Sequence, residues 1–314
     1  MCINSSNDDS IMVSIICNAY NHGEYIKDAL EGFVVQKTTF PFEILIHDDA
    51  STDDTAEIIR QYERKYPELI KPIYQRENQH SQNISISNTF QYPRAKGRYI
   101  ALCEGDDYWI DDHKLQKQFD AMEKCQEVDM CAHTASIKIG GKYKGLIMPK
   151  DKMCIIETNE VIQGGGGYFA TNSLFFRRNI FKDVPSFRIA YQIDYSLQIW
   201  GSLRGGVLFI PDNMSVYRKF NKNSWSLRMR KDAGAMEKSL KKIEEMLNIL
   251  NAETHYNYND IIQERISANW VRQLFLEHKY YELKHGRWGE YYSKMPIHLK
   301  VKLYIESLKS RLIF

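Results

Sequence analysis

Residues 98–109 read RYIALCEGDDYW, an apolar run followed directly by three carboxylates, Glu104, Asp106 and Asp107. The apolar run predicts a buried strand. Carboxylates that crowd the end of a buried strand repel one another and resist desolvation, so their crowding needs compensation. A divalent cation such as Mg²⁺ or Mn²⁺ would supply it, because these ions prefer oxygen ligands. An acidic cap on the next helix, within residues 106–119, explains the same carboxylates without a ligand.

Strands and helices are predicted to alternate through the first part of the chain. Short apolar runs predict buried strands at 11–17, 42–47, 70–75 and 98–103, and apolar residues at helical spacing predict helices at about 24–35, 55–66, 84–93 and 113–124. This alternation predicts an α/β fold with a mostly parallel sheet and helices on both faces. In such sheets ligands bind at the carboxyl ends of the strands, where NAYN, HDDASTDD and EGDDYW all lie.

The domain organisation follows from a change of pattern near residue 229. We expect a flexible tail at 1–10, one α/β domain at 11–228, and a helical C-terminal extension at 229–314. From Lys279 onward the extension has more basic than acidic residues, interleaved with Tyr, Trp, Leu and Ile. That composition suits peripheral contact with an anionic membrane surface, and simple packing and solvation explain it equally well.

Charge and hydropathy restrict the partners and the compartment. The net charge of +2 over 314 residues creates no overall field for nucleic acid, so we expect no nucleic-acid partner. No apolar stretch is long enough to span a membrane, and MCINSSNDDS does not resemble a signal peptide. We therefore expect a cytoplasmic protein, with the inner face of the membrane as a second location. The oligomeric state stays open, a homo-oligomer included.

Two further loops carry candidate binding residues. In HDDASTDD, Asp48 and Asp49 close a buried strand, where carboxylates can accept hydrogen bonds from a ribose hydroxyl or a base imide. In NAYN, Asn18, Tyr20 and Asn21 fit either turn chemistry or contacts to a base.

Asp194, in YQIDYSLQIW, stands at the head of a segment with apolar residues at helical spacing. A helix N-cap explains its position. A carboxylate there can also take a proton from an attacking hydroxyl, which is the chemistry of a general base. The residues alone leave both interpretations open.

Four stretches taken in order resemble the family 2 glycosyltransferases, inverting enzymes of the GT-A fold and of the bacterial polysaccharide-biosynthesis type. They are VSIICNAYNHGEYIKDALEGF (13–33), FEILIHDDASTDDTAEIIRQY (42–62), AKGRYIALCEGDDYWIDDHKLQKQ (95–118) and QIDYSLQIW (192–200). The resemblance implies a Rossmann-like, mostly parallel sheet flanked by helices. It also implies transfer of a sugar from a nucleoside-diphosphate sugar to an acceptor hydroxyl with Mn²⁺ or Mg²⁺ as cofactor.

The resemblance also implies roles for individual residues. EGDD occupies the place of the family's DxD-type metal motif, so Glu104, Asp106 and Asp107 would hold the metal and Asp106 would also reach the ribose. Asp194 would be the catalytic base. The nucleotide-binding residues would be Asn18, Tyr20, Asn21, Glu24, Asp48, Asp49 and Asp106, and the acceptor or lid residues would be Thr171, Asn172, Arg218, Lys219 and Trp225.

The chain departs from the family pattern at two places. Glu104 stands where aspartate is commoner, and Lys219 and Phe220 stand where similar enzymes often carry a histidine metal ligand after the Tyr-Arg pair. Arg218 or Lys219 would then neutralise the donor diphosphate directly.

We therefore expect a metal-dependent inverting glycosyltransferase that uses a UDP-sugar and a glycan or lipid-linked acceptor. A catalytically inactive nucleotide-sugar-binding module is the alternative that the missing histidine favours. A phosphoacceptor signalling domain is a weaker alternative, because it leaves EGDDYW (104–109) and Asp194 unused.

Overall fold

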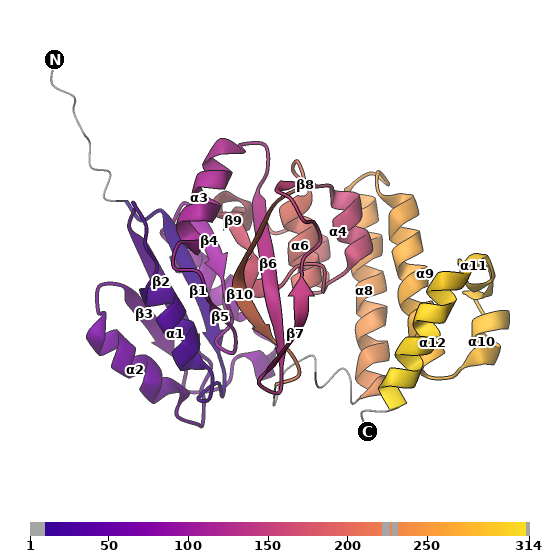
Figure 1. The fold of residues 1–314 in the computed structure, drawn as a ribbon, viewed down its shortest axis with the longest axis horizontal. Helices are drawn as coiled ribbons and strands as arrows, with labels where there is room; N and C mark the ends of the chain where they lie inside the picture. The colour runs from indigo at the N-terminus through magenta and orange to yellow at the C-terminus, as the bar shows by residue number, and fades with distance from the viewer. Residues whose placement is uncertain (1–9, 222–226, 228–231, 312–314) are drawn as a thin grey trace, which may run out of the picture. The chain divides into compact units, whose positions relative to one another are not determined.

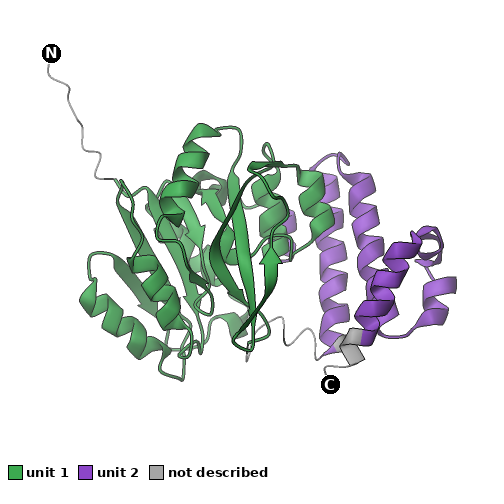
Figure 2. Ribbon diagram, viewed as in Figure 1, with its two compact units in different colours: residues 1–185, 192–227 green, residues 186–191, 228–314 purple. Residues whose placement is uncertain are grey.

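The structure is a computed structural model that describes residues 10–221, 227 and 232–311 (Figure 1). The chain divides into two compact units (Figure 2). Unit 1 comprises residues 1–185 and 192–227, and unit 2 comprises residues 186–191 and 228–314. Each unit is described by itself below.

The first half of the unit 1 sheet is parallel, as the alternating pattern predicts. β1 (Val13–Ala19) pairs in parallel with β2 (Phe42–Asp48) on one side and β4 (Tyr99–Leu102) on the other, and β2 pairs with β3 (Ile70–Tyr74). Both faces of β1 are buried, which is why its sequence is a continuous apolar run. Helices α1 (Ile26–Val34) and α2 (Thr55–Lys65) connect these strands.

The second half of the sheet is mixed. The strand order is β3-β2-β1-β4-β9-β6-β10-β5. Here β9 (Phe175–Arg177) runs antiparallel to β4 and to β6 (Met130–Ile139), whereas β10 (Val207–Arg218) is parallel to β6 and antiparallel to β5 (Tyr108–Trp109). β10 is not among the predicted strands, although it carries Arg218. Two strands pair at the side of this path, β7 (Lys142–Ile147) with β6 and β8 (Cys154–Ile156) with β10.

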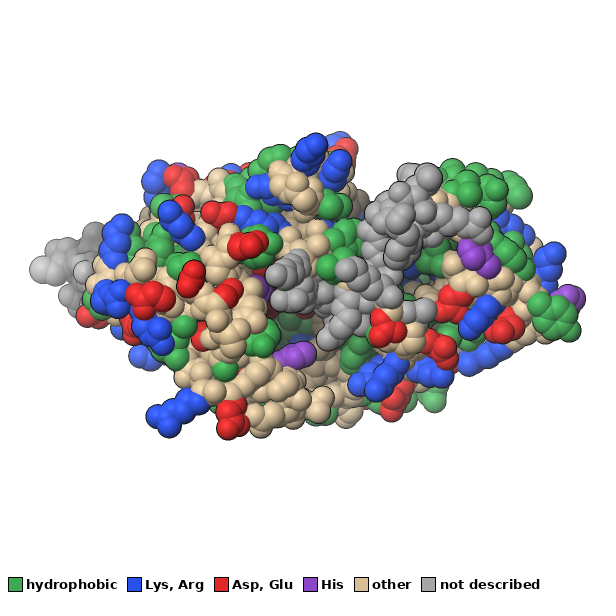
Figure 3. Space-filling view, turned by 90° about the horizontal axis from the view of Figure 1, so that it is seen from below, with side chains coloured by type: hydrophobic (Ala, Val, Ile, Leu, Met, Phe, Trp, Pro, Cys, Tyr) green, Lys and Arg blue, Asp and Glu red, His purple; other side chains and the backbone are tan. Residues whose placement is uncertain are grey.

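The order of the strands gives the sheet a switch point, where a ligand-binding crevice is expected at the carboxyl ends of the strands. Along the chain, pairing runs from β1 to β2 and β3 on one side and to β4 on the other, so the sheet has a switch point at β1. Main-chain hydrogen bonds continue past the strand ends, from Gly105 N–H to Asn18 O (2.9 Å) and from Asp49 N–H to Ala19 O (2.9 Å). The loops after β1, β2 and β4 therefore meet. Figure 3 views the molecule from this side, and acidic side chains are scattered over the face of unit 1.

Short helices complete unit 1. The α-helices are α3 (Lys114–Lys124), α4 (Thr158–Gly164) and α6 (Asp194–Ser202), and the other helical turns are η1 (His80–Gln82), η2 (Ser87–Gln91), η3 (Tyr92–Arg94), η4 (Thr171–Ser173) and η5 (Arg178–Lys182). Thr171 and Asn172, two of the predicted acceptor or lid residues, therefore lie in the tight turn η4, which leads into β9.

Unit 2 is helical, as expected for the C-terminal extension. Its helices are α5 (Ser186–Ala190), α8 (Ala233–Glu253), α9 (Asn259–Leu276), α10 (Tyr280–His285), α11 (Gly289–Lys294) and α12 (Ile297–Arg311). Val271, Leu274, Phe275 and Leu283 form a small buried core. Over the described ranges, none of the helices combines the length and the apolar character needed to cross a membrane.

A buried polar network ties the start of β4 to β1. The main-chain N–H of Gly97 donates to Ser14 Oγ (2.8 Å), and that hydroxyl donates to Glu43 Oε1 (2.6 Å). A Cβ atom on Gly97 would lie 2.3 Å from the main-chain nitrogen of Ser14 and 2.6 Å from the carbonyl carbon of Val13. Only glycine fits here, because the backbone of the central strand cannot move aside cheaply.

We predict that Gly97→Ala lowers the free energy of unfolding by roughly 2–4 kcal/mol, since the added methyl group overpacks the sheet. Chemical denaturation followed by circular dichroism measures it. Gly167→Ala is the matched control, because a Cβ atom there meets no atom within 4 Å. Equal stability of the two variants would contradict this packing.

Candidate active site

Asp107 is the most tightly held of the predicted metal residues. Its side chain is 2% exposed. Oδ1 accepts a hydrogen bond from the main-chain N–H of Arg218 (2.7 Å), and Oδ2 accepts one from Asn172 Nδ2 (3.1 Å). Burial, followed by the charge of Asp106, raises the pKa of Asp107, while the bond from Arg218 lowers it. The carboxylate is therefore fixed in one orientation.

Asn172 has every polar group of its side chain engaged. This fully buried residue donates to Asp107 and to the carbonyl of Val216 (2.9 Å), and its Oδ1 accepts from Ser215 Oγ (2.8 Å). Its own carbonyl accepts from Trp109 Nε1 (2.9 Å). Asn172 thus joins the turn before β9 to the end of β10. Asn172 therefore orients Asp107 through a hydrogen bond, and it has no solvent-exposed surface that an acceptor could contact.

Arg218, at the end of β10, holds the acidic loop from the other side. Its guanidinium donates to the main-chain carbonyl of Asp106 (2.8 Å) and forms an ion pair with Asp28 of α1. It also lies over the rings of Tyr25 (5.2 Å) and Tyr108 (4.2 Å). Arg218 is 8% exposed, so the structure gives it an anchoring position between α1 and the acidic loop.

Glu104, Asp106 and Asp194 form the acidic part of the crevice. Burial and then the charges of Asp194 and Asp106 raise the pKa of Glu104 to about 8, while hydrogen bonds from Asn18 lower it. Asp106 Oδ2 accepts a long hydrogen bond of 3.5 Å from Asn221. The structure therefore brings carboxylates from the loop after β4 and from α6 close enough to repel one another.

Asp194 is exposed at the first turn of α6. Its Oδ2 accepts a short hydrogen bond from Thr171 Oγ1 (2.5 Å). This bond orients the carboxylate, which stands in the first turn of a helix, where the helix dipole favours negative charge. Two residues predicted from the motifs, Thr171 and Asp194, are thus brought together across the sequence.

The predicted base-binding residues divide into two groups. Asp48 and Asp49 are buried, and both oxygens of Asp49 accept main-chain hydrogen bonds, from Gln79 (2.8 Å) and His80 (3.0 Å). Burial raises the pKa of Asp48, whose Oδ2 accepts from Ser51 N–H (3.4 Å). These two carboxylates therefore shape the loops after β2 and β3.

The residues of the loop after β1 differ in exposure. Asn21 adopts a left-handed conformation (φ 54°), and its Oδ1 accepts from the N–H of Thr52 (2.8 Å), so it links two loops. Asn18 Nδ2 donates to Ser87 Oγ (3.0 Å). Tyr20, 42% exposed, and Glu24 face solvent at the edge of the crevice.

The predicted lid segment is described only at its start. Lys219 donates its main-chain N–H to the carbonyl of Lys138 (2.9 Å), and its Nζ lies 5.2 Å from the centre of the Phe220 ring. Trp225 lies outside the described residues.

His22 belongs to the candidate site by its position, although the sequence motifs did not indicate it. A Cβ atom on Gly105 would lie 2.9 Å from His22 Nδ1, so the ring packs directly on the acidic loop. Burial lowers the pKa of His22, against the opposing charges of Asp106, Asp53 and Asp48. Only its position in the loop after β1 could have indicated that His22 lies near the candidate site. Asp28, the ion-pair partner of Arg218, gave no signal, because it occupies an ordinary helix position.

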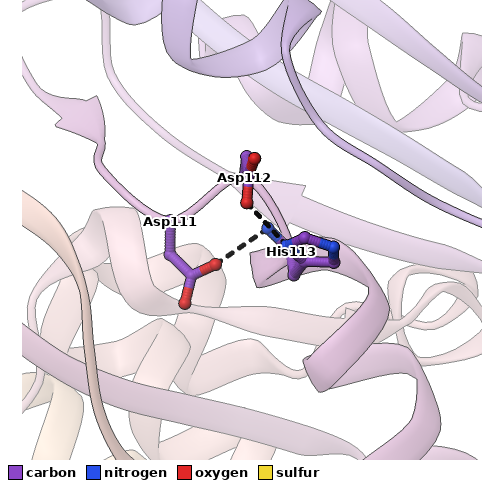
Figure 4. A group of neighbouring side chains, drawn as sticks. All are labelled: Asp111, Asp112 and His113. Carbon is purple, nitrogen blue, oxygen red and sulfur yellow. Dashed lines mark hydrogen bonds and ion pairs between the residues drawn. The ribbon is translucent and has the colours of Figure 1, made fainter.

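A second acidic group lies at the start of α3 (Figure 4). Asp111, Asp112 and His113 each offer one ligand atom, and these atoms lie within 4.8 Å of one another, a grouping of three that is found here among the described residues. Lys117 pairs with Asp111 (2.7 Å), and Lys37 pairs with Asp112. These carboxylates are already compensated, as expected for a helix start. The predicted metal residues are not gathered in this way.

We predict that Asn172→Ala lowers the free energy of unfolding by roughly 2–4 kcal/mol, because it leaves buried oxygens of Asp107, Ser215 and Val216 without their partner. Urea denaturation measures the loss. Thr171→Ala, at the adjacent and partly exposed position, is the control and should lose less than about 1 kcal/mol. A stable Asn172→Ala protein would show that Asp107 is held in another way.

Comparison with known proteins gives a family for the unit that carries this site. Residues 14–185, more than half of the chain, match the family model described as Glycosyl transferase family 2. An uncharacterized protein of Mycobacterium tuberculosis is 34% identical over 217 residues, which are 68% of this chain and 60% of that protein. The chain thus spans about 60% of the length of the first curated relatives that it matches.

Two characterised proteins are similar over different extents. The Escherichia coli UDP-Glc:alpha-D-GlcNAc-diphosphoundecaprenol beta-1,3-glucosyltransferase WfaP is 38% identical over 112 residues, 36% of this chain and 41% of that protein. The crystal structure of S. aureus TarS 1–349 in complex with UDP-GlcNAc superposes with a TM-score of 0.61 over 95% of this chain and 80% of that one. Their sequence identity is 16%, so this likeness concerns the fold alone.

Proposed function

The chain belongs to glycosyl transferase family 2, and we propose that it transfers a sugar from a UDP-sugar to the hydroxyl of a glycan or lipid-linked acceptor, with inversion at the anomeric carbon. In this proposal residues 11–228 form the transferase domain. One observation carries it. Carboxylates from the loop after β4 and from α6 lie near the switch point of the sheet, where burial and then the charges of Asp194 and Asp106 raise the pKa of Glu104 to about 8.

Asp194 is the proposed general base. It is exposed, and the hydroxyl of Thr171 orients its carboxylate. Asp194 would take the proton of the acceptor hydroxyl while that oxygen forms a bond to the anomeric carbon. The bond from this carbon to the diphosphate oxygen breaks on the opposite side, which inverts the configuration. Thr171 would position the base and the incoming hydroxyl.

The acidic loop fits a divalent cation. Asp107 is oriented by two hydrogen bonds and keeps lone pairs on both oxygens, and Asp106 has a single long contact to Asn221 among the described residues. Asp106 and Asp107 would hold Mn²⁺ or Mg²⁺, with Glu104 nearby. Such an ion stabilises the negative charge that grows on the leaving diphosphate. Mg²⁺ is commonly held by one or two carboxylates plus substrate phosphates, so a complete protein cage is not required.

The loops after β1 and β2 are the proposed nucleotide pocket. Tyr20 is exposed enough to stack on a base, and Asn18, Asn21, Glu24, Asp48 and Asp49 surround or shape the same crevice. The name of WfaP includes UDP-Glc, and the similar crystal structure of TarS contains UDP-GlcNAc. Both support UDP as the donor nucleotide. The name of WfaP also contains a diphosphoundecaprenol acceptor, which supports the lipid-linked acceptor.

The chain has no histidine directly after the Tyr217-Arg218 pair, so we propose separate roles for Arg218 and Lys219. Arg218 already compensates Asp28 and holds the acidic loop, so we assign it the positioning of Asp106 and Asp107. Lys219 would approach the diphosphate. An inactive nucleotide-sugar-binding module, the alternative, would keep the same pocket, and only turnover separates the two.

We predict that the parent protein binds UDP in the presence of Mn²⁺ and releases UDP from UDP-glucose or UDP-N-acetylglucosamine. Asp106→Asn should weaken Mn²⁺-dependent UDP binding at least about tenfold, since it removes a charged ligand. Asp194→Asn should bind UDP normally and lose roughly 10²–10⁴ in turnover. Calorimetry and a UDP-release assay measure these effects.

Asp111→Asn, in the second acidic group, is the matched control and should change neither quantity. Binding without any turnover of either UDP-sugar would favour the inactive module. Failure to bind UDP, GDP or TDP with or without Mn²⁺ would contradict the proposed site.

A further inference from the structure

Helix α12 (Ile297–Arg311) presents an apolar stripe to solvent. The stripe consists of Ile297, Val301, Tyr304, Ile305 and Leu308, with exposed fractions of 76%, 50%, 56%, 46% and 41%. Steps of four, three, one and three residues place all five on one face of a helix. A contiguous apolar face on the surface usually marks an interaction site.

The opposite face of α12 is already engaged within unit 2. Leu303 packs against the core that contains Val271 and Phe275, Ser307 is buried, and Glu306 forms an ion pair with Arg272 of α9. The helix α12 therefore already packs one face against unit 2. The stripe is a second apolar face, which is exposed to solvent.

Basic residues accompany the stripe. Among its described side chains, helix α12 carries Lys300 and Lys302 against the single acidic residue Glu306, whose charge Arg272 already compensates. Lys302 is exposed, and Lys300 Nζ lies 4.9 Å from the centre of the Tyr292 ring. An apolar face that is accompanied by positively charged side chains is complementary to the surface of an anionic bilayer.

We propose that this stripe docks unit 2 on an anionic lipid surface, with α12 lying in the plane of the interface. A helix of 15 residues is about 22 Å long, which suits an interfacial and not a spanning position. A second copy of the chain fits less well, because a twofold contact through the same face would bring the basic residues of both copies together. The inference does not depend on which sugar the transferase domain uses.

Flotation of the full chain with phosphatidylcholine vesicles, with and without phosphatidylglycerol, tests this surface. We expect binding to the anionic vesicles at low salt, loss at high salt, and little binding to neutral vesicles. Val301→Gln/Ile305→Gln should lower the bound fraction at least about tenfold, since it removes two apolar side chains that would enter the bilayer interface. Lys302→Glu should lower the bound fraction about fivefold or more. This variant tests the surface if the double variant does not fold.

Met148→Gln/Met153→Gln is the matched control, because these residues of unit 1 are 46% and 58% exposed. It should bind as the parent does. No binding of the parent, or equal binding of the control and the stripe variant, would overturn the proposal. A dimer in light scattering that Val301→Gln/Ile305→Gln converts to monomer would also overturn it, in favour of a second copy.

Discussion

The site depends on the two hydrogen bonds that the Asp107 carboxylate accepts. One comes from the main-chain N–H of Arg218 at the end of β10, and the other comes from the buried amide of Asn172 before β9. A buried carboxylate is costly unless its oxygens are paired, so these bonds fix the acidic loop after β4 in one place. They also bind the parallel and the mixed halves of the sheet together at the strand ends.

The rest of the site follows from that fixed loop. With Asp107 held, the pKa of Glu104 is raised by burial and then by the repulsion from Asp194 and Asp106. Arg218, which could have neutralised it, is paired with Asp28. A site built in this way attracts a cation and a ligand that carries its own phosphates, which is the chemistry we propose for a nucleotide-sugar donor.

Local patterns in the sequence predict much of the fold and some of the residues that the fold brings together at the candidate site. The buried strands β1, β2 and β4 and the amphipathic helix α1 follow from period and composition, which are local properties. β10 was not predicted, and neither was the orienting role of Asn172. These features rest on contacts between residues far apart, 111 positions in the case of Asp107 and Arg218. No local pattern encodes such contacts.

Anomalous diffraction from crystals grown with UDP and Mn²⁺ tests the central claim most directly, since it locates the cation without assuming a mechanism. The account predicts a manganese peak in contact with Asp106 and Asp107, next to the diphosphate of UDP. A peak at Asp111, Asp112 and His113, the group that is already compensated by lysines, would contradict it. So would bound UDP with no manganese at the acidic loop.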